Sequence, residues 1–277
     1  MSGLRLRLLA PPALRVDLRD LAPATFGMLA PDDAARQPLW HGRERIAVGD
    51  LFAVSGLGDP DDSPNSPTLA LEGDLRRFDY LGWQMETGTL RVDGHAGDYL
   101  GCGLRGGGIS VNGDAGDFAG AAQAGGEIDI TGNVGDFAAA ALPGDMEGMH
   151  GGHLRIGGNA GDRLGDRMRR GTVLVAGNAG AFAASRMVAG TLAVGGACGP
   201  HLAWAMRRGT VVLATAALPS AVTFVPVDSD IAVFWQLLSR SLARAGGPFS
   251  GLPGRRPHRQ LGDIAVDGKG ELLAVFD

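Results

Sequence analysis

The residues of this chain that could do chemistry begin with a glycine motif. Gly101, Gly103 and Gly106 match the pattern Gly-x-Gly-x-x-Gly. This pattern binds dinucleotide phosphates only where it joins a strand to the helix that follows. Residues 85–206 show no 3.6-residue hydrophobic period, so no helix is expected there. We therefore interpret these glycines as turn residues and not as a dinucleotide site.

Residues of metal-ligand type occur in two patterns, and neither is complete. Single carboxylates recur at regular intervals, at Asp98, Asp117, Asp136 and Asp162. Calcium needs about six to eight oxygen ligands, so we interpret these carboxylates as solvated corners. His150 and His153 have a zinc-like spacing but lack a third ligand nearby, and a polar loop explains them better.

Nucleophilic chemistry has no recognisable set of residues. The two cysteines, Cys102 and Cys198, are far apart in the sequence and have no metal-ligand spacing. No Ser/His/Asp set and no carboxylate pair stands out. We therefore predict that this chain has no catalytic residue and binds no metal or cofactor itself.

Three arginines, Arg105, Arg169 and Arg207, occupy equivalent positions in a sequence repeat. If the repeats stack, these side chains would form a basic stripe along one corner. Arginine pairs bidentately with carboxylates, so our hypothesis is that the stripe docks an acidic partner or a carboxylate-bearing ligand. The alternative is a solvated edge of surface charges that contributes little.

The repeat itself predicts the elements that position these residues. An anchor residue followed three positions later by glycine returns at spacings of 19, 19, 26, 19, 19 and 19 residues. The anchors are Met85, Leu104, Gln123, Met149, Met168, Met187 and Met206. Fixed periods of this size are typical of solenoids, in which each unit buries its apolar face against its neighbours.

Each repeat has the composition of a short all-β coil. An apolar pair two residues apart, such as Leu90 and Val92, predicts a strand. Glycine with Asn or Asp follows, and these residues accept positive φ, so a sharp corner is expected. A later apolar position is expected to form the second wall of the core. Its occupants are Tyr99/Leu100, Phe118, Phe137, Leu164, Phe182 and Leu202.

A 19-residue unit with two strands is too short to include a helix. The predicted fold is therefore all-β, a right-handed parallel β-helix solenoid of 19-residue coils. We expect residues 1–67 to form a small N-terminal β cap domain and linker, residues 68–215 the parallel β-helix, and residues 216–277 a C-terminal helix and tail. The 26-residue step holds seven extra residues within 138–147, expected to protrude as a loop.

The two ends of such a stack must be covered. Residues 1–9 alternate Arg with Leu, as an edge strand does. Near the other end an apolar stripe with helical spacing predicts a helix that seals the last coil. The stripe consists of Ile231, Phe234, Trp235, Leu238 and Leu242.

Composition excludes several classes of partner. The net charge of −5 and the sequence pI near 5.7 favour neither nucleic acid nor an anionic membrane. The sequence contains no run of eighteen apolar residues and no signal-peptide pattern at its start. A cytoplasmic protein is expected.

Two stretches carry a family resemblance. The repeated phrase Gly-Gly-Asn-Ala-Gly-Asp-Arg-Leu-Gly at 157–165 resembles the C-terminal β-helix of the glutamate synthase large subunit and also the C subunit of formylmethanofuran dehydrogenase. Leu39-Trp40-His41-Gly42-Arg43, together with residues 48–54, resembles the N-terminal segment of that C subunit. The chain has no amidotransferase or flavin domain, which favours the formylmethanofuran dehydrogenase family.

The resemblance implies a non-catalytic scaffold subunit in a bacterial formyltransferase/hydrolase complex of one-carbon metabolism. In that family the complex transfers a formyl group from tetrahydromethanopterin to a methanofuran-type carrier and releases formate. Hydrolysis belongs to a metal-dependent, amidohydrolase-like A subunit and transfer to a formyltransferase D subunit, and a B subunit completes the set. The alternative is a stand-alone glutamate-synthase-type β-helix domain in amide transfer.

Interface residues can be proposed from these features. Their sources are the family-like N-terminal segment, the insertion and the arginine positions. The candidates are Trp40, Arg43, Asp50, Phe52, Pro143, Met146, His150, Arg105, Arg169 and Arg207.

Overall fold

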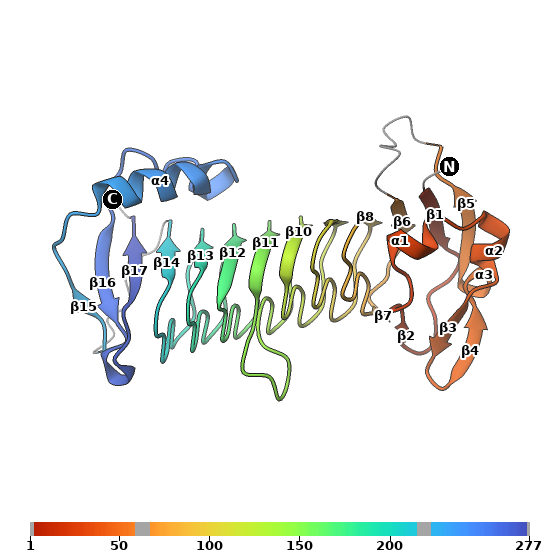
Figure 1. Cartoon of the computed structure of the whole chain (residues 1–277), viewed down its shortest axis with the longest axis horizontal. Coiled ribbons are helices and arrows are strands. Elements are labelled where there is room, and N and C mark those ends of the chain that lie inside the picture. Colours follow the sequence, from red (N-terminus) through yellow and green to blue (C-terminus); the bar gives the residue numbers. More distant parts are fainter. Residues whose placement is uncertain (1–2, 59–66, 215–222, 276–277) are drawn as a thin grey trace.

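The computed structural model describes residues 3–58, 67–214 and 223–275. These residues form an elongated stack of short coils, with the N-terminal part packed at one end and the C-terminal part at the other (Figure 1). Most of the linker expected before residue 67, and the boundary expected at residue 215, lie outside the described residues. Strands predominate over helices, which confirms the all-β class.

One large sheet runs the length of the stack. Within the described residues it has 13 strands in the order β15-β16-β17-β14-β13-β12-β11-β10-β9-β8-β6-β1-β5. Its strands are β1 (Gly3–Leu8), β5 (Phe52–Gly56), β6 (Thr68–Glu72), β8 (Thr89–Asp93), β9 (Gly108–Asn112), β10 (Ala124–Ile130), β11 (His150–Ile156), β12 (Arg170–Val175), β13 (Thr191–Val194), β14 (Thr210–Leu213), β15 (Val225–Pro226), β16 (His258–Gly262) and β17 (Gly270–Ala274).

The remaining elements lie mainly in the two terminal parts. A second sheet in the N-terminal part has the order β4-β3-β2-β7. Its strands are β2 (Val16–Asp17), β3 (Pro38–His41), β4 (Glu44–Ala47) and β7 (Phe78–Asp79). The helices are α1 (Pro23–Phe26), α2 (Pro31–Ala35), α3 (Val48–Leu51) and α4 (Ala232–Ala243), with 3-10 turns η1 (Gly247–Phe249) and η2 (Ile264–Val266).

The register of the large sheet equals the sequence repeat. Leu90 lies opposite Ile109, and Ile109 lies opposite Ile128, in parallel strands 19 residues apart. Across the longer step Ile128 lies opposite Leu154. The apolar pairs of β8 to β14 are no more than 3% exposed, so they line the interior. The predicted strands and their inward pairs are therefore confirmed, and each such side chain contributes about 1.5–3 kcal/mol by burial.

The seven extra residues leave the stack as a loop between β10 and β11 (Figure 1). The Met149 N–H donates to the Ala139 carbonyl at 3.1 Å, so the coil closes beneath the loop. Residues 143–147 are exposed. The prediction of a protruding insertion is confirmed.

The aromatic residues expected in the core lie instead on the outside of the stack. Tyr99, Phe118, Phe137 and Phe182 are half-buried, and all have positive φ between 59° and 61°. This backbone conformation turns each ring outward, and the residue that follows points inward. These inward residues are Leu81, Leu100, Ala119, Ala138, Leu164, Ala183 and Leu202. The prediction that these aromatic residues form a wall of the core is therefore wrong. The residue that follows each of them forms that wall instead.

The outward rings form a stacked column. Tyr99 stacks on Tyr80 and on Phe118, with ring centroids 4.6 and 4.8 Å apart. Phe118 stacks on Phe137 at 4.9 Å. In the coil after the insertion the position holds Arg163, whose guanidinium lies 5.0 Å from the Phe182 ring centroid and 5.9 Å from that of Phe137. The column thus continues through a cation–π contact across the interruption.

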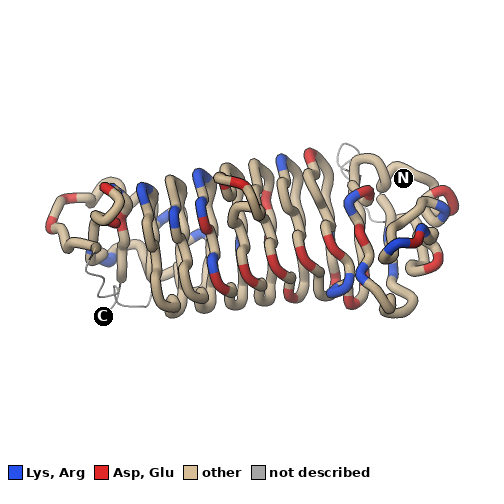
Figure 2. The backbone as a smooth tube through the Cα atoms, turned by 90° about the horizontal axis from the view of Figure 1, so that it is seen from below, with Lys and Arg blue, Asp and Glu red and all other residues tan. Residues whose placement is uncertain are grey.

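The regular aspartates link the coils directly. Each accepts, through Oδ1, the backbone N–H at the equivalent position of the next coil; Asp117 N–H donates to Asp98 at 3.0 Å and Asp136 N–H to Asp117 at 2.8 Å. Figure 2 shows acidic residues on successive coils along the stack. The interpretation as merely solvated corners was therefore incomplete, because these carboxylates stabilise the stacking.

Close approach explains the glycines better than positive φ does. A Cβ atom at Gly116 would lie 2.1 Å from Asp98 Oδ1. A Cβ atom at the corner residue Gly132 would lie 2.4 Å from Asp114 Oδ1, and its φ is not positive. The expectation of positive φ at these corners holds at Gly94, whose φ is 138°, but not at Gly113, Gly132, Gly158, Gly177 and Gly196, where close approach requires glycine instead.

The N-terminal part extends the large sheet. Strand β1 lies between β5 and β6, antiparallel to the first and parallel to the second. It is therefore an internal strand and not the edge strand that the alternation of Arg and Leu suggested. Leu4 and Leu6 are buried, whereas Arg5 and Arg7 are exposed.

The C-terminal helix does not seal the last coil. Strand β17 continues the parallel ladder after β14, and β16 pairs with β17. Helix α4 lies along the outer face of the sheet (Figure 1), where Trp235 and Leu242 pack with the outward residues Val212 and Leu273. The predicted helix is confirmed, but its position as a cap is wrong because the outer face of the last strands is itself apolar.

No helix in the described parts of the chain has both the length and the apolar character needed to cross a membrane.

Candidate functional site

The candidate interface residues occupy three separate regions. In the N-terminal part, Trp40 is 42% exposed, with the Arg45 guanidinium 4.6 Å from its ring centroid. Arg43 is exposed in the turn between β3 and β4. Asp50 accepts the Ala47 N–H at 2.8 Å and so caps α3.

Phe52 belongs to the core of the N-terminal part. It is 1% exposed, and its ring centroid lies 5.3 Å from that of Phe78. A side chain buried in this way supports the β5 strand and has no surface to offer a partner. Trp40, Arg43 and Asp50 are thus the accessible candidates of this region.

The insertion forms the second region. Met146 is 70% exposed, and its sulfur lies 2.8 Å from Arg167 Nη1. Pro143 is exposed beside it. Glu147 pairs with Arg169 at 3.0 Å, so the loop is tied to the next coil by an ion pair.

The arginine positions share one row of the stack but do not form a continuous stripe. Going along the row, the coils present Glu86, Arg105, Ala124, His150, Arg169, Val188 and Arg207. Arg105 pairs with Glu86 at 2.8 Å. The predicted basic stripe is therefore interrupted, and two of its three arginines are already paired with carboxylates.

A further site lies where α4 crosses the outer face of the sheet, and the sequence did not single it out. A groove of about 310 Å³ opens between β10, β11 and β12 on one side and the C-terminal end of α4 on the other. Its polar lining consists of Glu127, Asp129, His153, Arg155, Thr172, Ser241 and Arg244. A hollow of about 260 Å³ adjoins it and shares Asp129 and Arg155.

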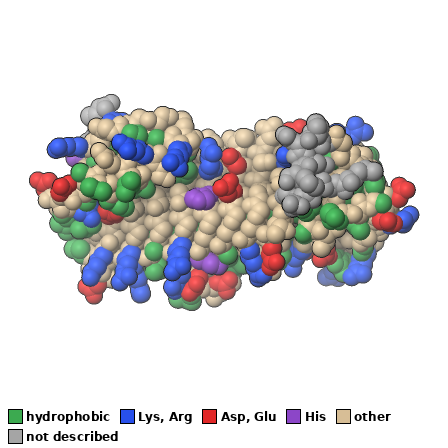
Figure 3. Space-filling view, turned by 45° about the horizontal axis from the view of Figure 1, so that its top comes forward, with side chains coloured by type: hydrophobic (Ala, Val, Ile, Leu, Met, Phe, Trp, Pro, Cys, Tyr) green, Lys and Arg blue, Asp and Glu red, His purple; other side chains and the backbone are tan. Residues whose placement is uncertain are grey.

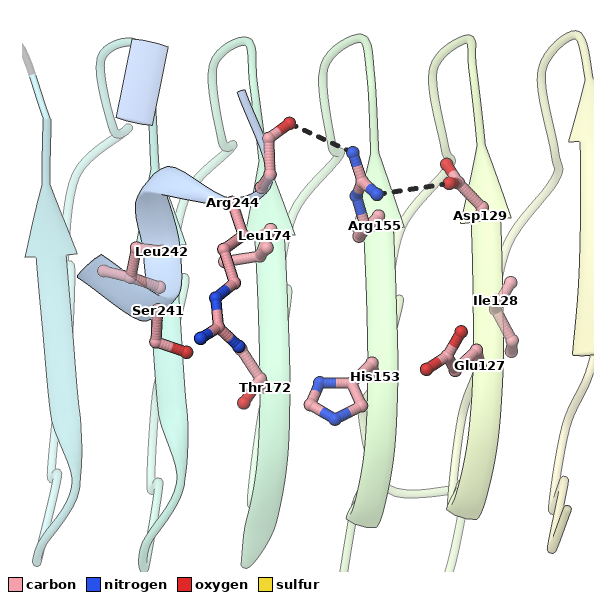
Figure 4. A pocket seen from close by; sticks show the side chains of 11 residues that line it. Glu127, Ile128, Asp129, His153, Arg155, Thr172, Leu174, Ser241, Leu242 and Arg244 are labelled. Carbon is pink, nitrogen blue, oxygen red and sulfur yellow. Dashed lines mark hydrogen bonds and ion pairs between the residues drawn. The ribbon is translucent and has the colours of Figure 1, made fainter. Parts of the chain in front are cut away.

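Outward strand positions supply most of the groove. Asp129 and Arg155 are opposite each other in the register of β10 and β11. Both point outward, because each stands between two inward apolar residues. Arg155 Nη1 lies 3.6 Å from Asp129 Oδ2, and Nη2 donates to the Ala245 carbonyl at 3.0 Å. Figure 4 shows this arginine joining the strand to the segment after α4.

The other charged groups of the groove face open space. Glu127 lies opposite His153 in the strand register, and both side chains are exposed. Arg244 reaches over Thr172 from the end of α4 (Figure 4). The groove therefore presents donors and acceptors side by side. The sequence signal was the charged residues between inward pairs, but their meeting with Arg244 depends on where α4 packs.

The residues of metal-ligand type lie in different surroundings from those expected, because His150 and His153 belong to strand β11 and not to a polar loop. No group of three or more His, Cys, Asp or Glu side chains among the described residues is placed to hold a metal ion. Burial raises the pKa of both Cys102 and Cys198 to about 12, so both thiols stay protonated near neutral pH.

Stacked glycine-rich coils define the class of protein. The family model described as the GXGXG motif matches residues 72–221, more than half of the chain. The chain therefore belongs to the GXGXG-motif family.

Two relatives of the chain are C subunits. The chain is 42% identical over 97 residues to the C subunit of the formyltransferase/hydrolase complex Fhc of Methylorubrum extorquens, covering 35% of this chain and 33% of that protein. It is 30% identical over 84 residues to the C subunit of tungsten-containing formylmethanofuran dehydrogenase 2 of Methanothermobacter wolfeii, covering 30% of each. The matched stretches thus span about a third of these curated relatives.

A solved structure extends the likeness to the whole chain. A chain in the crystal structure of the formyltransferase/hydrolase complex FhcABCD from Methylorubrum extorquens, in complex with methylofuran, has a TM-score of 0.88 and 38% identity. The alignment covers 99% of this chain and 100% of that one. The chain is thus a homologue of the C subunit of that complex, which confirms the resemblance.

Proposed function

We propose that this chain is a scaffold subunit, without an active site of its own, of a formyltransferase/hydrolase complex in one-carbon metabolism. The complex would transfer a formyl group from tetrahydromethanopterin to a methanofuran-type carrier and release formate in the cytoplasm. The observation that carries the proposal is the likeness, over the full length of both chains, to a chain of FhcABCD.

Its partners would be an amidohydrolase-like A subunit that holds the metal, a B subunit and a formyltransferase D subunit. The coils would wind as a right-handed parallel β-helix, which the 19-residue parallel register supports. Trp40, Arg43, the insertion and the arginine row are the surfaces we propose for contact with these partners.

Affinity purification of the tagged full-length chain from its host, followed by mass spectrometry, tests the proposal. We expect chains resembling the other three members of the complex to co-purify in fixed ratio, with formyl transfer activity in the eluate. An untagged host extract is the control. Recovery of amidotransferase and flavin chains would support the amide-transfer alternative, and a monodisperse free chain would overturn the scaffold proposal.

A further inference from the structure

Helix α4 has two different faces, and only one of them is covered. Trp235 and Leu242, which face the sheet, are 5% and 2% exposed. Val233 and Leu237, on the opposite side, are 74% and 67% exposed, and Phe234 beside them is 42% exposed. A surface helix normally turns polar residues to water, so large aliphatic side chains at the centre of an outward face indicate a contact surface.

The outward face becomes basic toward the end of the helix. Val233, Leu237 and Arg240 follow one another at i, i+4 and i+7, so they lie on a single line of the helix. Arg244, at i+11, continues this line just past the end of the helix, and its side chain reaches from there into the groove between α4 and the sheet. Neither arginine forms an ion pair with a described residue, and both are exposed. Figure 3 shows hydrophobic and basic side chains together over this part of the surface.

The charge of this face selects a partner. The whole chain carries a net charge of −5, whereas α4 contains no Asp or Glu and its outward line ends in two arginines. A partner surface with an apolar patch beside carboxylates would cover the aliphatic residues and pair with both guanidinium groups. Arginine and large apolar side chains are also the residue types that anchor protein interfaces.

We propose that the outward line of α4, formed by Val233, Leu237, Arg240 and Arg244, docks another member of the complex through an apolar patch flanked by Asp or Glu. The inference rests on the proposed function, because it takes the partner from within that complex. The groove beside Arg244 lies next to this line, so the docked surface would extend toward the sheet.

Two full-length variants, purified from the host with their partners, separate the apolar and the basic contributions. V233Q/L237Q removes the aliphatic side chains but keeps good helix formers, and R240E/R244E reverses the charge. R7E/R36E is the charge-matched control at exposed positions in the N-terminal part. Far-UV circular dichroism and thermal unfolding verify that each variant is folded, as expected for changes at exposed positions.

We expect one partner chain to fall about tenfold or more in the eluate of both α4 variants, since buried interface anchors dominate affinity. The control should retain wild-type recovery. With a photo-crosslinker at Leu237, the captured peptide should contain apolar residues together with Asp or Glu.

Other outcomes overturn the inference in distinguishable ways. If the wild-type chain captures no partner, the proposed function fails first. If the wild-type chain captures partners and both α4 variants capture them equally well, α4 is not a docking surface. If only one of the two variants loses a partner, the partner surface does not combine an apolar patch with Asp or Glu as proposed. Binding of the wild-type chain to phosphatidylserine vesicles, or its self-association, that the variants lose while keeping their partners would assign this face to a membrane or to a second copy instead.

Discussion

At the residue scale, the stack depends on how closely its coils approach one another. The Asp98 carboxylate lies so near Gly116 that a side chain there has no space, and the same holds at Gly135 beside Asp117. Burial raises the pKa of Asp98, while the N–H of Asp117 acts in the opposite direction. The aspartate series is therefore a set of structural hydrogen-bond acceptors whose desolvation is offset by backbone donors.

Gly116→Ala tests this close approach. The added Cβ would lie 2.1 Å from Asp98 Oδ1 and displace the acceptor of the Asp117 N–H. We expect a loss of about 1–3 kcal/mol in the free energy of unfolding, measured with urea. Gly108→Ala is the matched control, because a Cβ there has no heavy atom within 4 Å and the φ is not positive. Equal effects of the two substitutions would contradict the explanation.

Asp114 gives a pH dependence whose sign can be worked out. The N–H of Asn133, which donates to Oδ1 at 2.8 Å, holds the pKa of Asp114 below its ordinary value of 3.8. The ionised form is thus favoured in the folded state. Its contribution is present above the unfolded pKa and is lost as the pH falls through the folded pKa.

Asp114→Asn should therefore make stability less sensitive to acid. The amide oxygen can still accept the Asn133 N–H, as Asn133 itself does from Asn159 at 2.8 Å, so stability near neutral pH should change little. Urea unfolding from about pH 5 to below the ordinary Asp pKa should show a shallower decline than in the wild-type chain. Asp145→Asn, in the exposed insertion, is the control and should leave the decline unchanged.

At the scale of elements, the sequence predicts which strands pair better than it predicts which side chains point into the core. The repeat, with its single 26-residue step, predicted every strand pairing from β8 to β14, because only one register buries all the apolar pairs. The aromatic positions were misassigned because an apolar ring does not reveal its own φ. Their positive φ follows from packing between coils, which a single repeat does not contain.

The groove and the place of α4 were harder to predict for the same reason. The spacing of Trp235 and Leu242 shows that α4 buries one side, but not which surface it covers. The available signal was the outward apolar residues Ala193, Val212 and Leu273, which are all 0% exposed. The groove follows only when the buried side of α4 and the apolar outer face of the last strands are considered together.

Phe118→Ala tests whether the aromatic column is outside the core. The ring makes two stacked contacts, at 4.8 and 4.9 Å, and each such pair contributes about 0.5–1.5 kcal/mol. Ile109→Ala, at a side chain 3% exposed, should cost about 2–5 kcal/mol. We expect Phe118→Ala to be the smaller loss in urea unfolding. A larger loss than for Ile109→Ala would return the ring to the core.

Deletion of residues 142–148 tests the insertion as an element added to a complete coil. The deletion restores the 19-residue spacing, and the bond from Met149 N–H to Ala139 already closes the coil. We expect the thermal unfolding temperature to stay within a few degrees of that of the wild-type chain. If the exposed Met146 lies in an interface, recovery of one partner chain should fall while folding persists. Loss of folding would contradict the extruded-loop description.

At the scale of the whole molecule, an open stack needs cover at its last strand and on its outer face. Strand β17 pairs with β14, and α4 with Phe249 and Leu252 covers the outer face of the last coils. Unpaired strands and exposed apolar faces associate with further chains. We therefore expect the C-terminal part to keep the stack from associating with further chains.

A chain that ends after Ala214 should consequently self-associate. It would expose the free edge of β14 together with Ala193 and Val212, which are fully buried in the whole protein. Size-exclusion chromatography with light scattering should show oligomers or aggregates where the full-length chain elutes as one species. Charged residues at exposed sheet positions oppose such association, so A193K/V212K should reduce it in the truncated chain. In the full-length chain the same two lysines would be buried against Trp235 and Leu242 and should destabilise it, because an unpaired charge is costly to bury. A truncated chain that stays monomeric, or lysines that act alike in both contexts, would contradict the covering role of the C-terminal part.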